Sequence, residues 1–462
     1  MKILFTGMIA LLLAFTGNAA ADILGLGSPS VSKSILTTQT EQQPAKVAVE
    51  QSWQLSSATA TALLSTKIGQ SLIINDFPQL TQQPQKKSVS NAITLKRYEL
   101  FAPGARIIVI SDQGQQEIIR PQLYAFSSSK DGVGLLVDPR TGNVTGLHNQ
   151  AGISMDITGN LNSGLNFKKT LSDQAGAESL YQCGTTMANQ PGDPFAQVAE
   201  ALSSRSASIS TTSTTSYQAV IAVDTDMQWM DGKGNNTTTA MNYINTIFVN
   251  MNVFMERDLS LRLLIGVTYL RIGSDPIPPE DDIAAYLNDF GEYWRVNQTA
   301  VERDFTVLFS GENIASNAFS GVAWLDQYCQ NGFVFGANNT AGSYSVNRIG
   351  SNASAGFISQ FVGHELGHNL GSPHTHCYTP AVDTCFNAEA GCYTGGVSCP
   401  VGGKGTIMSN CHFGAPNGAG CGLSNSEYHP TVIGLLNSRI TANSPSCIAP
   451  LMLTGIFEDG FE

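Results

Sequence analysis

The stretch HELGHNLGSPH, residues 364–374, holds three of the seven histidines in this 462-residue chain, together with one glutamate. His364 and His368 are four residues apart, so on a helix they share one face and their rings can converge on one metal ion. Glu365 lies about 100° round that helix, beside the ion, where a carboxylate suits a general base acting on water. This spacing predicts a metal site on a helix.

The residues that follow the two histidines can supply a third ligand. Gly371 can adopt a backbone conformation that other residues resist, so it can end the helix and turn the chain to bring His374 to the ion. Three protein ligands leave one position for water, as in catalytic zinc sites. The alternative is a core helix with incidental histidines, because apolar residues recur at helical spacing. These residues are Phe357, Ile358, Phe361, Val362, Leu366 and Leu370.

A second motif lies downstream, in GTIMSNC, residues 405–411. Together with the HExxHxxGxxH pattern it resembles the metzincin metalloproteases, in which a methionine turn lies beneath the zinc. Met408 matches that methionine, as a packing residue and not a ligand. The Ile-Met-Ser sequence and the nearby cysteines are most similar to the adamalysin (reprolysin) branch, including its bacterial members. Thr375 stands where many adamalysins have an aspartate, and the resemblance covers residues 217–448.

The resemblance implies a zinc endopeptidase with an α/β (α+β) protease domain, in which a twisted mixed sheet packs with the zinc-site helix. His364, His368 and His374 would hold one Zn²⁺, and Glu365 would act as base and then as acid. The strand GVAWLD, residues 321–326, would form the sheet edge on which an extended protein or peptide substrate pairs. The resemblance also allows structural Ca²⁺, without assigning ligands to it.

Two functions from other classes compete with this interpretation. One is a secreted binding or adhesion protein that keeps the metzincin fold with little or no protease activity. The other is a zinc hydrolase that acts on something other than peptides. The presence of Glu365 argues against the first, and Met408 with the expected edge strand argues against the second.

The composition of the chain predicts five segments. Lys2, an apolar run and Ala19-Ala20-Ala21 are typical of a secretory signal peptide, so we expect an extracellular or periplasmic protein. Runs such as SLIIND and GVGLLVDP predict a β-rich propeptide domain, or else a binding domain that stays attached, and SSRSASISTTSTTS predicts a flexible linker. The segments are a signal peptide at 1–21, a propeptide domain at 22–202, a linker at 203–216, a protease domain at 217–448 and a C-terminal tail at 449–462.

Within the protease segment, hydrophobic periodicity predicts alternating strands and helices. The expected strands are 217–226, 261–272, 304–311, 320–326 and 343–349, and the expected helices are 238–258, 278–294 and 354–371. The second helix is expected to begin at its prolines, Pro278 and Pro279.

The charge of the chain limits its partners. The formal net charge is −12 and only 13% of residues are charged, which argues against binding to nucleic acid. Beyond the signal peptide no apolar run is long enough to span a bilayer. We expect a monomer whose partners are protein or peptide substrates.

Eight of the nine cysteines lie in the last third of the chain, which predicts four disulfides in an exported protein. A second zinc site is the alternative, but none of these cysteines shows C-x₂-C spacing. The resemblance implies a bridge from Cys329 to a cysteine near the C-terminus, namely Cys447. We expect the bridges to pin the long loop between His374 and Met408.

Cys183, in YQCGTT, is the ninth cysteine and lies in the predicted propeptide. Cys183-Gly184 resembles the cysteine switch of metzincin propeptides, in which a thiolate fills the position on zinc that water needs. The alternatives are a free thiol, or a bridge that leaves a different cysteine over.

The other four histidines carry weaker predictions. His148 is expected to be a surface or packing residue, and His429 a structural residue near the C-terminal helix. His376 could be the third ligand in place of His374 if the turn differs, and His412 either lines the cleft or has a structural role. The acidic end LTGIFEDGFE is either a frayed terminus or a recognition tag for export.

Overall fold

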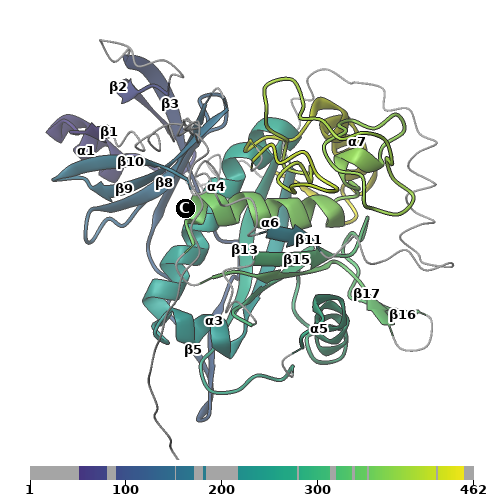
Figure 1. Cartoon of the computed structure of the whole chain (residues 1–462). Helices are drawn as coiled ribbons and strands as arrows, with labels where there is room; N and C mark the ends of the chain where they lie inside the picture. Colours follow the sequence, from purple (N-terminus) through teal and green to yellow (C-terminus); the bar gives the residue numbers. More distant parts are fainter. Residues whose placement is uncertain are drawn as a thin grey trace, which may run out of the picture. The chain divides into compact units, whose positions relative to one another are not determined.

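The computed structural model describes most of the chain from residue 51 to residue 451 (Figure 1). The described residues are 51–80, 90–150, 152–170, 181–183, 217–277, 280–312, 319–335, 339–350, 353–422 and 425–451. All of the described residues belong to one compact unit, Ala48–Glu462. The predicted signal peptide and linker, and nearly all of the predicted tail, therefore lie outside the described residues.

A mixed nine-stranded sheet carries the functional region. Its strand order is β11-β15-β18-β14-β12-β13-β4-β5, with β19 paired to β12. The strands are β4 (Ile107–Ser111), β5 (Gly114–Ile118), β11 (Tyr181–Cys183), β12 (Tyr217–Thr225), β13 (Leu261–Arg271), β14 (Phe305–Ser310), β15 (Phe319–Ala323), β18 (Tyr344–Arg348) and β19 (Ala449–Pro450). β12, β13, β14 and β18 are parallel, whereas β15 is antiparallel to β18. All five strands predicted after residue 217 are therefore confirmed.

The helices of this region begin at side-chain caps. They are α3 (Met227–Gly232), α4 (Thr237–Leu259), α5 (Ile283–Asn297), α6 (Ala355–Asn369) and α7 (Pro430–Ala442). Asn236 caps α4 and Ser354 caps α6, each by accepting a hydrogen bond from a backbone N–H three residues on. The expectation that the second helix begins at its prolines is wrong. α5 begins at Ile283, because the Asp282 side chain accepts a hydrogen bond from the Ala284 N–H and caps it there.

Helices cover both faces of this sheet, and the alternation of side chains along β12 shows it. Ile221 and Val223 point into a core that they share with α4, α6 and α7. Ala222, between them, points to the opposite face, where Phe290 and Trp294 of α5 are fully buried. Successive residues of a strand face opposite sides of a sheet, so a strand buried on both faces is apolar throughout. This is the mixed α/β architecture expected from the sequence.

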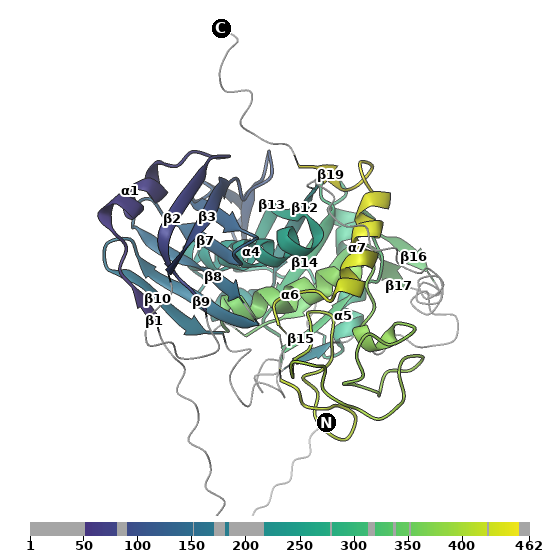
Figure 2. The same ribbon diagram turned by 90° about the horizontal axis from the view of Figure 1, so that it is seen from above.

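The region before residue 170 is rich in β-structure, as predicted. An eight-stranded antiparallel sheet has the order β1-β10-β9-β8-β7-β6-β3-β2. Its strands are β1 (Gln51–Trp53), β2 (Ser71–Pro78), β3 (Ser90–Tyr98), β6 (Tyr124–Ser128), β7 (Val133–Val137), β8 (Asn143–Gln150), β9 (Ile153–Asn160) and β10 (Gly164–Lys169). Helix α1 (Ser57–Ser65) packs through Leu63 into the core of this sheet. The other face of the sheet packs against α4 (Figure 2).

Four disulfides join the eight cysteines after residue 320, as predicted. They pair Cys329 with Cys447, Cys377 with Cys392, Cys385 with Cys411 and Cys399 with Cys421. The last three cross-link the long irregular segment between α6 and α7, whose described residues include the short 3₁₀ helix η4 (Thr375–Cys377). The predicted link between Cys329 and Cys447 is confirmed.

A small separate sheet lies near α5. It consists of the antiparallel pair β16 (Phe333–Phe335) and β17 (Asn339–Ala341). Among the described residues, no helix combines the length and the apolar character that crossing a membrane requires.

His148 lies in the core of the eight-stranded sheet, so its predicted packing role is confirmed. Its ring is fully buried between Phe77 and Phe167, and neither ring nitrogen has a hydrogen-bond partner. Burial therefore lowers the pKa of His148 to about 4, although Asp131 opposes the shift. Because this pKa lies below the value in the unfolded chain, stability is present at neutral pH and is lost as the pH falls from about 6.5 towards 4.

The buried His148 ring makes the eight-stranded sheet sensitive to acid. On going from pH 7 to pH 5, we expect the parent to lose on the order of 2 kcal/mol more unfolding free energy than His148→Phe, which cannot bind a proton. Denaturant unfolding of both proteins at the two pH values measures the difference. Equal losses would contradict the assignment.

Candidate metal centre

The zinc-motif residues lie on the last turns of α6 and on the turn that follows it. His364, Glu365 and His368 belong to α6, and all three side chains are buried. Gly371 has φ +108° and its N–H bonds to the His368 carbonyl, so the helix ends and the chain reverses, as predicted. His374 follows this turn and is also buried. One helix and one glycine turn therefore bring the three histidines together.

The three rings face a common point. One donor atom from each of His364, His368 and His374, and the sulfur of Cys183, all lie within 4.8 Å of one another. Nε2 of His368 is 3.2 Å from Nε2 of His364 and 3.6 Å from Sγ of Cys183. Two nitrogens on one tetrahedral zinc are about 3.3 Å apart, and a nitrogen and a sulfur are about 3.6 Å apart. The observed separations fit this metal.

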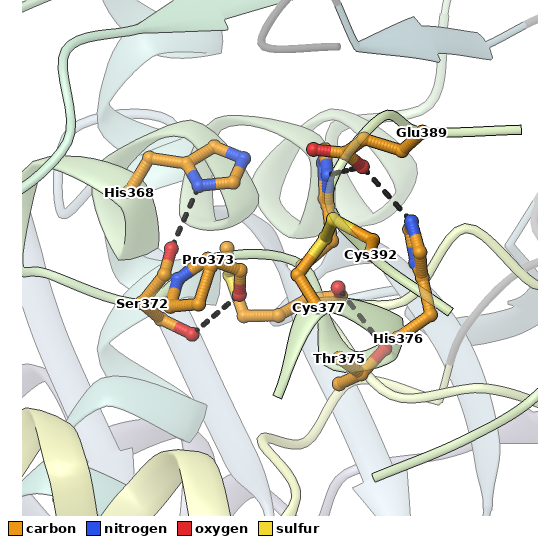
Figure 3. Close-up of a disulfide and its surroundings, with 10 residues drawn as sticks. His368, Ser372, Pro373, Thr375, His376, Cys377, Glu389 and Cys392 are labelled. Atoms are coloured by element: carbon orange, nitrogen blue, oxygen red, sulfur yellow. Dashed lines mark hydrogen bonds and ion pairs between the residues drawn. A yellow bond between two sulfur atoms is a disulfide. The ribbon is translucent and has the colours of Figure 1, made fainter. Parts of the chain in front are cut away.

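The opposite nitrogen of each ring is held from behind. Nδ1 of His364 donates to the Ile407 carbonyl at 2.5 Å, and Nδ1 of His368 donates to the Ser372 carbonyl at 2.7 Å (Figure 3). A carbonyl can only accept, so both rings carry their proton on Nδ1 and present a lone pair on Nε2. Two lone pairs 3.2 Å apart repel unless a cation lies between them. The donor set therefore fits a zinc ion.

The third ring has a carboxylate partner that sequence reasoning missed. Nδ1 of His374 is 2.7 Å from Oε2 of Glu389, and Nε2 of His376 is 2.9 Å from the same oxygen. Figure 3 shows Glu389 beside His376 and next to the disulfide between Cys377 and Cys392. No spacing rule pointed to Glu389, because it lies in a loop without periodic pattern. His376 thus lies outside the three-histidine cluster and contacts Glu389, the carboxylate that holds His374.

Two of the three clustered histidines are neutral at pH 7, whereas the pKa of His374 is raised well above its usual value, because the effect of burial is outweighed by the Glu389 carboxylate and the Cys183 sulfur. Burial lowers the pKa of His368 to about 3 and that of His364 well below its usual value, so both rings are neutral at pH 7. Burial would raise the pKa of Glu389, but the rings of His374 and His376 outweigh it and hold that pKa well below its usual range. Glu389 is therefore ionised, and it supplies the negative charge that a ligating histidine prefers behind it.

Glu365 has room beside the metal point because the neighbouring strand carries a glycine. A Cβ on Gly321 of β15 would lie 2.3 Å from Oε1 of Glu365, so any other residue there would force the carboxylate to move. Oε2 of Glu365 is 3.9 Å from Sγ of Cys183. The carboxylate thus lies next to the point on which the histidines converge, where a base acting on water is needed.

Met408 packs against α6 at Gly367, the residue before His368. It is fully buried, and a Cβ on Gly367 of α6 would overlap its sulfur. The Met408 carbonyl accepts hydrogen bonds from both the N–H and the hydroxyl of Thr375. Thr375 therefore ties the segment that carries His374 to the methionine turn.

Cys183 reaches the site on a strand of its own. β11 pairs in parallel with β15, with Cys183 opposite Gly321. Its side chain is only 4% exposed, and Cys183 is the one cysteine outside the four disulfides. The structure thus brings Cys183 together with the three histidines, and it excludes the disulfide alternative for this residue.

Two other histidines lie outside the cluster. His412 is buried and contacts Phe413, with 4.3 Å between the centroids of the two tilted rings. His429 caps α7 by accepting a hydrogen bond from the Thr431 N–H, which is the structural role predicted for it.

Comparison with known proteins identifies the region that bears this site. The family model described as metallo-peptidase family M12, of the reprolysin group, matches residues 214–417. The chain carries a reprolysin-like M12 metallopeptidase domain. Peptidases of this family use zinc, which agrees with the donor set of the site. The similarity to the adamalysin branch inferred from the motifs is therefore confirmed at the level of the family.

Comparisons of the whole chain add little to this family match. No curated protein matches the chain. Among solved structures, metalloproteinase-II from Bacteroides fragilis is similar at a TM-score of 0.30 and 13% identity, over 63% of this chain and 80% of that one.

The contact between Glu389 and His374 predicts a positioning role. Glu389→Gln should weaken zinc binding by about 10- to 100-fold. The carboxylate orients the His374 ring and makes its free nitrogen more basic, and the neutral amide loses this charge. Competition of the full chain with a chromophoric chelator measures the affinity. The matched control is Glu302→Gln, which removes an exposed carboxylate of the same type. Equal zinc affinities in the two variants would refute the role.

Proposed function

We propose that the protein is a zinc-dependent endopeptidase made as a latent zymogen, with His364, His368 and His374 as the metal ligands. The observation that carries the proposal is the convergence of three imidazoles, each held from behind by a fixed acceptor. Peptide-bond hydrolysis follows from the M12 family of the domain. Ca²⁺ has no support among these contacts and stays an expectation.

Glu365 is the proposed general base and acid. When bound, zinc would supply Lewis acidity towards water and the peptide carbonyl. Glu365 takes a proton from the attacking water as its oxygen bonds to the carbonyl carbon, and gives that proton to the amide nitrogen as the C–N bond breaks. Its carboxylate is fully buried, so it meets little competition from bulk water.

The substrate is proposed to bind as an extended strand on β15. One edge of β15 pairs with β18, and the other pairs with β11 in this structure. A peptide that replaced β11 could form the same kind of backbone hydrogen bonds, which bind a chain independently of its side chains. This arrangement favours protein and peptide substrates over small molecules.

Latency is proposed to come from Cys183. Its sulfur is 3.6 Å from Nε2 of His368 and 3.9 Å from the Glu365 carboxylate, so it takes the place that water and a scissile carbonyl need. Zinc favours the thiolate form of a coordinating cysteine. The backbone of β11 also covers the edge of β15, so the segment blocks both the metal and the substrate strand.

Secretion is part of the proposal. Four disulfides lie in the metallopeptidase region, and such bonds form and persist in oxidising compartments. The predicted signal peptide agrees with this destination.

Substitution of Glu365 tests the catalytic assignment. After proteolytic activation, Glu365→Gln should keep about one zinc per chain and lose peptide hydrolysis by at least about 100-fold, because the ligands remain but the base is gone. His368→Ala should lose both zinc and activity. Metal analysis and cleavage of a peptide library measure the two properties, with Glu302→Gln as control. A parent enzyme that cleaves no peptide, with or without a chelator, would favour the binding or adhesion protein instead.

Substitution of Cys183 tests latency. The uncut Cys183→Ser chain should hydrolyse peptides, whereas the uncut parent should be latent, because serine is a much poorer zinc ligand than a thiolate. A thiol-modifying mercurial should activate the parent and leave Cys183→Ser unchanged. If the uncut variant is as latent as the parent, coverage of β15 by β11 accounts for latency without a zinc–sulfur bond.

A further inference from the structure

The hairpin of β4 and β5 belongs to the predicted propeptide by sequence and to the metallopeptidase sheet by structure. β4 pairs in parallel with β13, on the opposite side of the sheet from β15. Phe101, just before the hairpin, extends the pairing as a bridge to Ile265. The bridge is formed by two backbone bonds, Ala102 N–H to Ile265 O and Ile265 N–H to Leu100 O, both at 2.9 Å. Two further bonds, Thr268 N–H to Arg106 O and Ile272 N–H to Ile110 O, join the segments at 2.8 Å.

Both faces of β4 are part of the metallopeptidase core. Ile107 and Val109 lie in the cluster that contains the side chains of α4 and α6, and Ile107 is fully buried. Ile108 and Ile110 point the other way and join the cluster around α5. A strand covered on both faces is a core strand and not a docked peptide. Interfaces of this kind resemble a domain core cut in half and are typical of permanent complexes.

The eight-stranded sheet adds a second contact, on α4. Leu136 of β7 lies in the same cluster as the side chains of α4, while its neighbours Leu135 and Val137 face the sheet's own core. A Cβ on Gly134 would lie 2.8–3.1 Å from side-chain and backbone atoms of Val249 and Val253, so the strand and the helix are in close contact. Most residues of α4 are buried, on every side of the helix. A helix buried all round needs a partner on each side.

Hydrogen bonds fix the sheet to the metallopeptidase elements. The Thr145 and Thr246 hydroxyls are 2.8 Å apart, and Asp156 accepts from the Gly356 N–H in the first turn of α6 at 2.9 Å. Nδ2 of Asn149 donates to the Ser426 carbonyl at 2.8 Å. These bonds come from two neighbouring strands, β8 and β9, and reach α4, α6 and the segment before α7.

The contact of β11, the strand that carries Cys183, with the edge of β15 is much smaller. We call this strand the latch. β11 has three residues, and its pairing partners in β15 are Phe319, Ser320 and Gly321. The N-terminal region therefore holds the metallopeptidase at two unlike places, with a large core interface at β13 and α4 and a short strand at β15.

From this contrast we propose that residues 51–170 remain bound as a permanent non-covalent subunit after the chain is cut. It follows that a cut on one side of Cys183 leaves the enzyme latent, and that release requires cuts on both sides. This inference rests on the proposed zinc latch. A strand tethered to a bound partner has an effective concentration of the order of millimolar, so one cut does not dilute it. Loss of residues 51–170 would instead bare the β13 edge and the apolar side of α4.

The test places recognition sequences for a site-specific protease within residues 171–180, within residues 203–216, or within both segments of the full chain. Each cut protein is examined by size-exclusion chromatography in native buffer, by the rate at which Cys183 reacts with a thiol reagent, and by peptide hydrolysis. Cys183 is the one cysteine outside disulfides, so the thiol signal reports it alone.

The expected result differs between single and double cuts. With either cut alone, both pieces co-elute and Cys183 stays protected. With both cuts, residues 51–170 still co-elute with the metallopeptidase, while thiol reactivity and peptide hydrolysis rise on the order of 100-fold over the single cuts. A fragment 51–170 that separates after the double cut would overturn retention. Full thiol exposure after a single cut would overturn the two-cut requirement.

These readouts separate the inference from the proposed function. Co-elution and thiol exposure need no catalysis, so they test retention and release even if every form fails to cleave peptides, which would instead sink the proposed function. A matched pair then locates the interface. In the doubly cut protein Ile107→Ala should raise the dissociation constant of the pieces at least about tenfold, because the side chain is fully buried. Ile119→Ala, at a position 94% exposed just beyond the same hairpin, should leave it unchanged.

Discussion

The metal centre depends on hydrogen bonds that point away from it. His364, His368 and His374 can present Nε2 to one point only because Nδ1 of each ring is bound by an acceptor that the fold holds still. Two of these acceptors are backbone carbonyls, fixed by the methionine turn and by the turn after α6. The third is the Glu389 side chain, which is positioned by a cross-linked loop. The three proposed ligands are therefore held in place by three separate pieces of chain.

The range of each interaction along the chain decides whether it could be predicted from the sequence. The histidines four apart, the glycine turn and the apolar period of α6 are local, so the helix and the convergence of its histidines with His374 could be predicted directly. The start of α5 was misplaced because a proline pair is a weaker signal than the Asp282 cap. The sequence does not predict the role of Glu389, because no periodic pattern links a loop carboxylate to a ring 15 residues away. Short apolar runs predict a β-rich region before residue 203, but the pairing of β4 with β13 depends on contacts between distant segments, which such runs do not encode.

Gly321 shows how one position can serve several parts of the site. It gives the Glu365 carboxylate its space, pairs with Cys183 and lies on the strand proposed to receive the substrate. Any side chain there would press on the base, on the latch strand and on an incoming peptide together. Gly321 is therefore restricted in size by three neighbours at once, although it has no side chain that could take part in the reaction.

The disulfide between Cys377 and Cys392 affects the order in which the chain is oxidised and binds metal. It closes the short loop that carries Glu389, three residues before the second cysteine. Before that bond forms, the loop would hold the carboxylate less firmly against His374, the third proposed ligand. Oxidation should therefore precede tight metal loading during biogenesis. A chain still in a reducing compartment would bind zinc poorly, and the order of its maturation would protect the proteins of the cell that makes it.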